Sequence, residues 1–379
     1  MKFLHLSDLH IGKNLNNYLM LEEQRNAFRQ IIGYVKSERP AAVVIAGDVY
    51  DRAIPSVEAV RLFDDFLTEL ALENVAVLLI SGNHDSPERI GYASRLLADK
   101  QLILYGAFDG ELRRYTLADE FGDVNFWLLP FIRPLSVRGM YDEPEIESYD
   151  DAVSAAIGSA GVDYSARNVL ISHQFFTKSG VVPVRSESEL TPVGGLDAVD
   201  AGIIEKFDYA ALGHLHGCQD VGAGHIRYSG SPVKYSFSEC LHEKSVTLVM
   251  LGGKGDLSVR LLPITPIHEM RGIEGEIEEL MDEAFVSLYD REDYLYVTLT
   301  DEEDLIDPMG RLRTVYPNVM GFNIKNSRTS IDLSEVSTDE AAVGKLSPYD
   351  LFCEFFLKTQ GSTMSAEQDA IVRELMEGD

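Results

Sequence analysis

The chain has 379 residues, 45% of them hydrophobic, and a formal net charge of −29. A charge this negative argues against broad, autonomous binding to nucleic acid, which usually needs a basic face. A polyanionic substrate would therefore have to be held by metal ions, by a local cluster of Lys and Arg, or by a partner protein.

The sequence predicts a protein with two or three domains and no membrane span. No run of residues approaches eighteen apolar positions, and the apolar stretch at the N-terminus is too short for a signal peptide. The three cysteines, at positions 218, 240 and 353, are odd in number and widely spaced, which is typical of reduced thiols rather than of a disulfide framework. We therefore expect a cytoplasmic protein.

The first ten residues, MKFLHLSDLH, combine a strand-like apolar run with two potential metal ligands, Asp8 and His10. A carboxylate and an imidazole separated by one residue suit a divalent cation such as Mn, Fe or Zn. The D-x-H spacing alone is weak, because it occurs by chance on protein surfaces. Its meaning depends on whether the rest of the chain supplies partner ligands.

Four further apolar runs are also followed by potential ligands, as expected where parallel strands end and functional loops begin. Residues 41–46 precede Asp48 and Asp51, residues 75–80 precede Asn83, His84 and Asp85, residues 169–172 precede His173, and residues 209–212 precede His214 and His216. Glycines at 47, 82 and 213 allow sharp turns that could direct these side chains to a shared centre. Five such units in one chain predict a metal site.

Between these runs the sequence predicts a mixed α/β domain, with strand–helix units early in the chain. Helical spacing covers residues 19–36, 57–72, 87–98 and 148–160, and strands are expected at 101–105, 112–117 and 125–130. Residues 179–199 are polar and rich in Gly and Pro, so we expect a long loop near the site. Strands at 225–229, 244–251 and 257–262, with a turn at 252–255, complete two packed sheets with helices outside.

The remaining chain predicts a small second domain and a tail. Pro263 and Pro266 mark a boundary after residue 265, and residues 266–335 alternate strands (270–273, 294–300, 321–325) with helices (275–284, 307–316). We expect an α/β capping domain there, a linker at 336–346, and a helical pair at 347–379. So short a pair cannot bury its apolar face alone, so it must pack on the body or on a partner.

The order D-x-H, G-D-x-x-D, G-N-H-D, H, G-H-x-H resembles the signature of the calcineurin-like metallophosphoesterase superfamily, from Asp8 to His216. Longer stretches narrow the resemblance: HLSDLHIGK, AGDVYDR, SGNHDSPERI, LGHLHGCQ and YSGSPVKYSFSE are similar to the double-strand-break repair nucleases. This family includes the SbcD-type nuclease subunits of bacterial SbcCD complexes. The resemblance extends over essentially the whole chain and is weaker in the cap.

The resemblance implies two Mn²⁺ ions per chain, with Mg, Fe or Zn as alternatives. One ion would be held by Asp8, His10, Asp48 and His216, and the other by Asp48, Asn83, His173 and His214. His84 would be the catalytic residue, near the phosphate. Asp51 and Asp85 are expected to orient the histidines. Arg52, Arg89, Lys234 and Tyr235 lie in or near family motifs and would contact the DNA backbone, although structural roles are an equal alternative.

The family implies a Mn-dependent DNA nuclease with 3′→5′ double-strand exonuclease and endonuclease activity, including hairpin opening. It would act with the SMC-like ATPase SbcC in DNA repair, recombination and replication. The tail would bind SbcC. Helices 57–72 and 87–98 would form a homodimer within an SbcC2–SbcD2 heterotetramer, with plain core packing of these helices as the alternative. Two alternatives remain: a metallophosphatase or cyclic-nucleotide phosphodiesterase with the same two-metal site, and a non-catalytic scaffold that tethers DNA ends.

Overall fold

The computed structural model describes residues 1–141, 146–178, 183–189 and 197–327, and isolated positions between 349 and 373. The chain divides into two compact units, Met1–Glu269 and Met270–Asp379. The boundary predicted after residue 265 lies slightly earlier than this division. The predicted linker at 336–346 lies outside the described residues, as does most of the helical pair at 347–379.

The first unit contains two six-stranded sheets. The first has the order β16-β15-β1-β4-β5-β6, and its strands β1, β4, β5 and β6 are mutually parallel. The bounds are β1 Lys2–Leu6, β4 Ala42–Ala46, β5 Ala76–Ile80, β6 Leu102–Tyr105, β15 Ser245–Leu251 and β16 Leu257–Pro263. The turn predicted at 252–255 joins β15 to β16, which pair antiparallel.

The second sheet has the order β13-β14-β12-β9-β8-β7, with β14, β12, β9 and β8 parallel. The bounds are β7 Arg113–Asp119, β8 Gly122–Leu129, β9 Arg167–Ser172, β12 Tyr209–Leu212, β13 Gln219–Asp220 and β14 Ile226–Tyr228. The strands predicted at 101–105, 112–117 and 125–130 correspond to β6, β7 and β8. Smaller elements in this unit are β2 Asn14–Leu15, β3 Tyr18–Leu19, β10 Phe175–Thr177, β11 Ala198–Asp200 and α5 Pro134–Val137.

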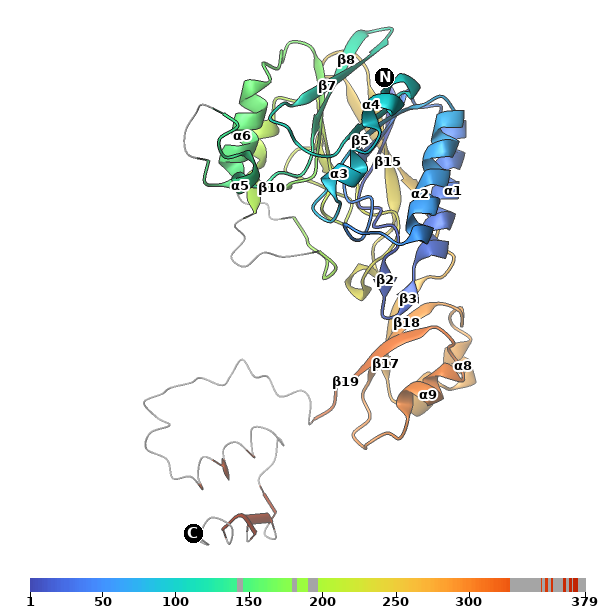
Figure 1. The fold of residues 1–379 in the computed structure, drawn as a ribbon. Coiled ribbons are helices and arrows are strands. Elements are labelled where there is room, and N and C mark those ends of the chain that lie inside the picture. The colour runs from blue at the N-terminus through green and yellow to red at the C-terminus, as the bar shows by residue number, and fades with distance from the viewer. Residues whose placement is uncertain are drawn as a thin grey trace. The chain divides into compact units, whose positions relative to one another are not determined.

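The two sheets face each other across a buried apolar core. Phe3 of β1 contacts Phe126 of β8 and Tyr209 of β12 edge-on, with ring centroids 5.3 and 5.8 Å apart. Because side chains alternate along a strand, the neighbouring residues point to the outer faces. Helices α1 and α2 lie outside the first sheet, and α5 and α6 outside the second (Figure 1). The predicted two-sheet sandwich flanked by helices is confirmed.

Three helices largely match their predicted positions: α1 Leu21–Glu38, α2 Val57–Leu72 and α6 Tyr149–Ser159. Ser56 and Ser148 begin the last two, because their side chains accept hydrogen bonds from backbone amides of the first turn. The helix predicted from residue 19 begins later, since Tyr18–Leu19 pairs as β3 with β2.

The single helix predicted at 87–98 is wrong. The segment forms α3 Pro87–Ile90 and α4 Ser94–Leu97, separated by Ala93 at a left-handed φ of 58°. At this point the chain lies very close to the end of β6: a Cβ on Gly106 would be 1.8 Å from the Pro87 carbonyl oxygen. The periodicity could not reveal this tertiary contact.

The second unit is a small α/β domain. It has a parallel sheet of β17 Met270–Gly275, β18 Tyr294–Leu299 and β19 Val319–Ile324, with helices α7 Ile277–Leu280, α8 Glu283–Val286 and α9 Pro308–Arg313. The helix predicted at 275–284 is two short helices, because the Asp282 side chain accepts a hydrogen bond from the Ala284 amide and starts α8. In the part of the chain that the structure describes, no helix has the length and apolarity that a membrane crossing requires.

Candidate metal centre

The candidate site lies where five parallel strands end. Asp8 and His10 follow β1, Asp48 follows β4, Asn83 follows β5, His173 follows β9, and His214 and His216 follow β12. Because each sheet is parallel in this region, the carboxyl ends of its strands lie at one edge. The two edges bring all seven predicted ligands together.

Glycines allow the loops to approach one another closely. A Cβ on Gly82 would lie 2.1 Å from Asp48 Oδ1, and one on Gly213 would lie 2.0 Å from the Ala46 carbonyl oxygen. Gly47 combines a φ of +85° with only 2.4 Å between such a Cβ and His173 Nδ1. These positions tolerate no side chain without displacing the candidate ligands.

Four of the candidate ligands have left-handed backbone conformations. The φ angles are 53° at Asp8, 41° at His10, 48° at Asp48 and 106° at His214. Such conformations cost about 1–3 kcal/mol each in residues other than glycine and concentrate at functional sites. The fold therefore holds these side chains in place at a conformational cost.

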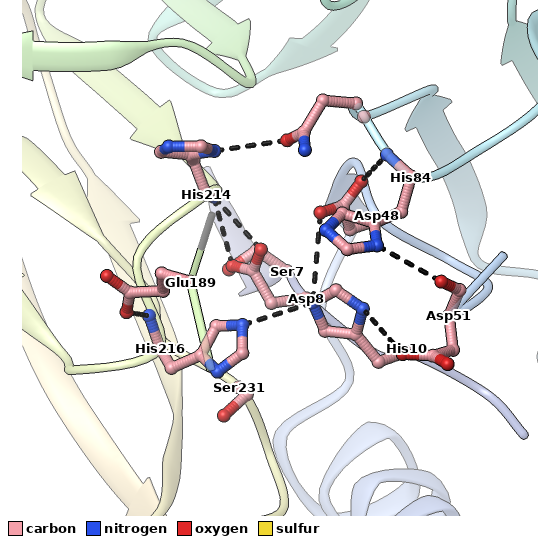
Figure 2. A network of polar contacts seen from close by, with 12 residues as sticks. Ser7, Asp8, His10, Asp48, Asp51, His84, Glu189, His214, His216 and Ser231 are labelled. Atoms are coloured by element: carbon pink, nitrogen blue, oxygen red, sulfur yellow. Dashed lines mark hydrogen bonds and ion pairs between the residues drawn. The ribbon is translucent and has the colours of Figure 1, made fainter. Parts of the chain in front are cut away.

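One group of donor atoms surrounds His10. Its Nε2 atom lies 3.1 Å from His216 Nε2 and 3.7 Å from Asp48 Oδ2. Asp8, His10 and His216 each contribute an atom to a cluster whose members lie within 4.8 Å of one another, and all three residues are buried. Figure 2 shows these side chains gathered from loops that are far apart in the sequence.

A second group surrounds His173. Its Nε2 atom lies 3.2 Å from Asp48 Oδ2 and 3.1 Å from Asn83 Oδ1, which in turn lies 3.1 Å from His214 Nδ1. Asp8, Asp48 and His173 also satisfy the spacing of a metal cluster. Asp48 also clusters with His10 and His84, so it lies between the two groups as a bridging carboxylate would, and Asp8 contributes to both groups as well.

The donors fit divalent metal ions. Carboxylate, imidazole and amide oxygen are ligands for Mn, Fe and Zn. Metal–nitrogen bonds of about 2.0–2.1 Å place adjacent ligand atoms roughly 3.0–3.4 Å apart, close to the separations seen here. Among the described residues, buried His10 Nδ1 and His214 Nε2 have no hydrogen-bond partner.

Electrostatics also favour a cation. Burial, together with the charge of Asp48, raises the pKa of Asp8 to about 7. Burial lowers the pKa of His214 to about 3 and the pKa of His10 well below its usual range, so both imidazoles are neutral and carry a free lone pair. A divalent ion would relieve the repulsion between the two buried carboxylates.

Comparison with known proteins identifies the family. Residues 1–218 match the family model described as calcineurin-like phosphoesterase. The chain is 32% identical over 326 residues to the SbcD subunit of the nuclease SbcCD from Staphylococcus epidermidis, covering 85% of each protein. The chain belongs to the SbcD family of calcineurin-like phosphoesterases. Residues 266–360 match a second model, SbcD_C, described as the type 5 capsule protein repressor C-terminal domain.

Matches among solved structures include a Thermus thermophilus protein and a dimetal phosphatase from Danio rerio. Each is 14% identical to the chain; the TM-scores are 0.40 and 0.39. The alignments cover 69% and 70% of this SbcD-family chain and 98% and 99% of those structures.

In this SbcD-family chain, His84 borders both donor groups. Its backbone amide donates to Asp48 Oδ1 at 2.9 Å, and its ring lies 4.8 Å from the ring of His10. His84 Nδ1 lies 3.0 Å from the backbone carbonyl oxygen of Asp51. Because a carbonyl only accepts, Nδ1 carries the proton and Nε2 of this half-buried ring keeps its lone pair.

The two carboxylates expected to orient histidines act differently. Asp51 holds His84 through its backbone carbonyl, while its side chain pairs with Lys13 at 2.8 Å and lies 3.9 Å from His10 Nδ1. The orienting role expected for Asp85 stays a prediction. Its carboxylate accepts hydrogen bonds from the backbone amides of Val49, Tyr50 and Gly82, and so ties the β4 and β5 loops together.

Two of the four residues expected to contact DNA are poorly placed for it. Arg52 and Arg89 are exposed, Arg52 by 74% of its side chain. Lys234 is nearly buried and pairs with Glu269, and Tyr235 is buried, with its hydroxyl donating to the Leu9 carbonyl. Burial favours the structural alternative for Tyr235, because almost none of its surface could meet a phosphate.

Sequence reasoning missed a group of polar residues around His216. Ser188 and Glu189 come from the loop predicted near the site, and Glu239 and Lys244 follow β14. Glu239 is the last residue of the stretch YSGSPVKYSFSE, so the family resemblance of that stretch could have pointed to it. The sequence also did not single out Arg185, whose guanidinium lies 3.6 Å from the ring centroid of Phe175, next to His214.

Proposed function

We propose that this protein is a manganese-dependent DNA nuclease that acts with the ATPase SbcC. The observation that carries the proposal is the position of Asp48, whose carboxylate clusters with His10 and His84 on one side and with Asp8 and His173 on the other. Two-metal sites are a recurrent solution for hydrolysing phosphodiesters in nucleases and phosphatases. The Staphylococcus relative is named as part of the nuclease SbcCD, which supports DNA as the substrate.

The proposed ligand sets are those expected from the sequence: Asp8, His10, Asp48 and His216 for one ion, and Asp48, Asn83, His173 and His214 for the other. Bound ions would supply Lewis acidity toward the phosphate and a water molecule activated at neutral pH. The protein's part is to hold buried imidazoles and paired carboxylates in a constrained loop cluster.

His84 is the proposed catalytic residue. The Asp51 carbonyl fixes its ring orientation, and the hydrogen bond from its amide to Asp48 ties its backbone to the metal site. An imidazole near the reacting phosphate can stabilise the developing charge or protonate the leaving oxygen. Arg52 and Arg89 are the exposed cations that we retain as DNA contacts.

The acidic chain favours a partner that contributes DNA-binding surface. We propose that SbcC supplies it and binds the tail at 347–379. The proposed activities are 3′→5′ exonuclease and endonuclease, including hairpin opening, in DNA repair, recombination and replication in the cytoplasm.

A homodimer within an SbcC2–SbcD2 assembly is the proposed state. Exposed apolar side chains on and near the predicted dimer helices support it: Val57 is 60% exposed, Tyr92 80% and Leu96 79%. Large apolar groups left in water in this way are typical of interaction surfaces.

The test is cleavage of a short DNA hairpin and a linear duplex in Mn²⁺, with and without SbcC and ATP. Wild type, Asp48→Ala and His84→Ala are compared, with His225→Ala as a histidine control outside the site. Cleavage by wild type and the control, lost in the other two, supports the proposal. Hydrolysis of small phosphodiesters without DNA cleavage would instead indicate a phosphatase or cyclic-nucleotide phosphodiesterase, and DNA-end tethering that survives His84→Ala would indicate a scaffold.

A further inference from the structure

The ring of His216 is held from the side opposite His10. Its Nδ1 atom lies 2.8 Å from Ser188 Oγ and 3.1 Å from Glu239 Oε1. The Ser188 hydroxyl donates its single proton to the same Glu239 oxygen, at 2.7 Å. Both neighbours of Nδ1 are therefore acceptors, so Nδ1 must be the atom that carries the ring proton.

The consequence appears at the other ring nitrogen. With the proton on Nδ1, Nε2 keeps its lone pair, and this is the atom that lies 3.1 Å from His10 Nε2 inside the first donor group. The tautomer is thus matched to metal binding before any ion arrives. A hydrogen-bonded carboxylate behind a histidine ligand also increases the basicity of the ligand.

Glu239 can play this part because Lys244 compensates its charge. The Glu239 side chain is 0% exposed and that of Lys244 6%, and Lys244 Nζ lies 2.6 Å from Glu239 Oε2. Although burial opposes ionisation, the hydrogen bond to His216 and the charge of Lys244 hold the pKa of Glu239 well below its usual range. Lys244 also donates to the His216 carbonyl oxygen at 3.0 Å and to Ser231 Oγ at 2.8 Å, so all three of its protons have acceptors.

A charged pair buried this completely is a poor way to gain stability, because desolvation offsets most of the attraction. Its contact with one candidate ligand suggests a different purpose. We propose that Glu239, supported by Lys244 and bridged by Ser188, is a positioning residue that fixes the His216 tautomer and orientation for the metal ion shared with Asp8, His10 and Asp48. This inference rests on the proposed two-metal function.

The test uses the double variant Glu239→Gln/Lys244→Met, because Glu239→Gln alone would leave a buried ammonium without its partner. Asp119→Asn/Arg167→Met is the control, since it removes another ion pair, formed on the second sheet between buried Arg167 and partly exposed Asp119. Calorimetric titration of each purified protein with Mn²⁺ gives the number and affinity of the ions. Nitrogen NMR shifts of the His216 ring in the metal-free protein report its tautomer directly.

We expect wild type and the control to bind two ions, and the Glu239 double variant to bind one of them roughly 10–100-fold more weakly. Its His216 ring should also show a mixture of tautomers. Equal affinities and an unchanged tautomer would overturn the inference while leaving the nuclease proposal standing. Absence of metal binding in the wild type would instead overturn the proposed function itself. If the double variant does not fold, Ser188→Ala, which removes only the bridging hydroxyl, gives the same readouts with a smaller expected change.

Discussion

His10 Nε2 and His216 Nε2 lie 3.1 Å apart although 206 positions separate them in the chain. One residue follows β1 of the first sheet and the other follows β12 of the second. The contact exists because the parallel strands of both sheets end at the same place in the fold. It defines one half of the candidate site.

The two halves of the site should be separable by mutation. We expect His10→Ala to lose one of the two ions while the Asn83–His173–His214 group keeps the other, because those donors do not include the imidazole of His10. Measuring bound manganese per chain checks this. His225→Ala is the control, and loss of both ions or of neither in His10→Ala would contradict the division into two groups.

Gly82 should be intolerant of even one methyl group. In Gly82→Ala the new Cβ would begin 2.1 Å from Asp48 Oδ1, so the bridging carboxylate must move. We expect a loss of about 1–3 kcal/mol in the free energy of unfolding and much weaker metal binding. Gly253→Ala is a matched control because no atom lies within 4 Å of its Cβ position. Denaturant unfolding and metal titration measure both effects, and equal behaviour of the two variants would refute the prediction.

His84→Ala should separate catalysis from metal binding. The ring touches the site but is not among the proposed ligands, so we expect both ions to bind while the cleavage rate falls roughly 10²–10⁴-fold. Single-turnover cleavage in Mn²⁺, alongside metal content, measures the two quantities. Loss of an ion together with the rate would make His84 a ligand instead.

The buried His5 should make the fold sensitive to acid. Burial lowers the pKa of His5 to about 3, below the ordinary value of 6.5. As the pH falls below 6.5 the unfolded chain takes up a proton that the folded chain excludes, so stability decreases from pH 6.5 towards about 3. At pH 5 this lowers the free energy of unfolding by about 2 kcal/mol relative to neutral pH.

Urea unfolding of wild type and His5→Gln at pH 7.5 and pH 5 checks this prediction. Gln can replace the hydrogen bonds to Tyr209 and the Leu212 carbonyl only imperfectly, so the variant should be less stable at pH 7.5. Its further loss on acidification should nevertheless be smaller than that of wild type. An equal loss in both proteins would show that His5 is not responsible.

Deleting residues 346–379 should abolish co-purification with SbcC and leave metal binding intact. The candidate ligands all lie in the unit Met1–Glu269, which has its own core, so the deletion removes none of them. Affinity capture with tagged SbcC, followed by metal analysis of the truncated protein, gives both results. A complex that survives the deletion would place the SbcC contact elsewhere.

The ligand types, their order and the strands that carry them could be predicted from the sequence. Short apolar runs that end in polar residues are a local signal for candidate ligands. The choice of Asp8, His10, Asp48, Asn83, His173, His214 and His216 among those candidates came from the family resemblance. The two-sheet sandwich could be predicted for the same reason. Helix α2 was predicted with its observed bounds, from its apolar spacing, and Ser56 caps its first turn.

Which side chains meet depends on the tertiary fold. Asp85 binds the backbone of the β4 loop, and buried Tyr235 donates a hydrogen bond to the Leu9 carbonyl. Helix α3 ends early, where Pro87 approaches Gly106. The same is true of the contact of Glu239 and Ser188 with His216. These contacts join segments from different parts of the chain, and their energies depend on burial and distance, which no local pattern of residues encodes.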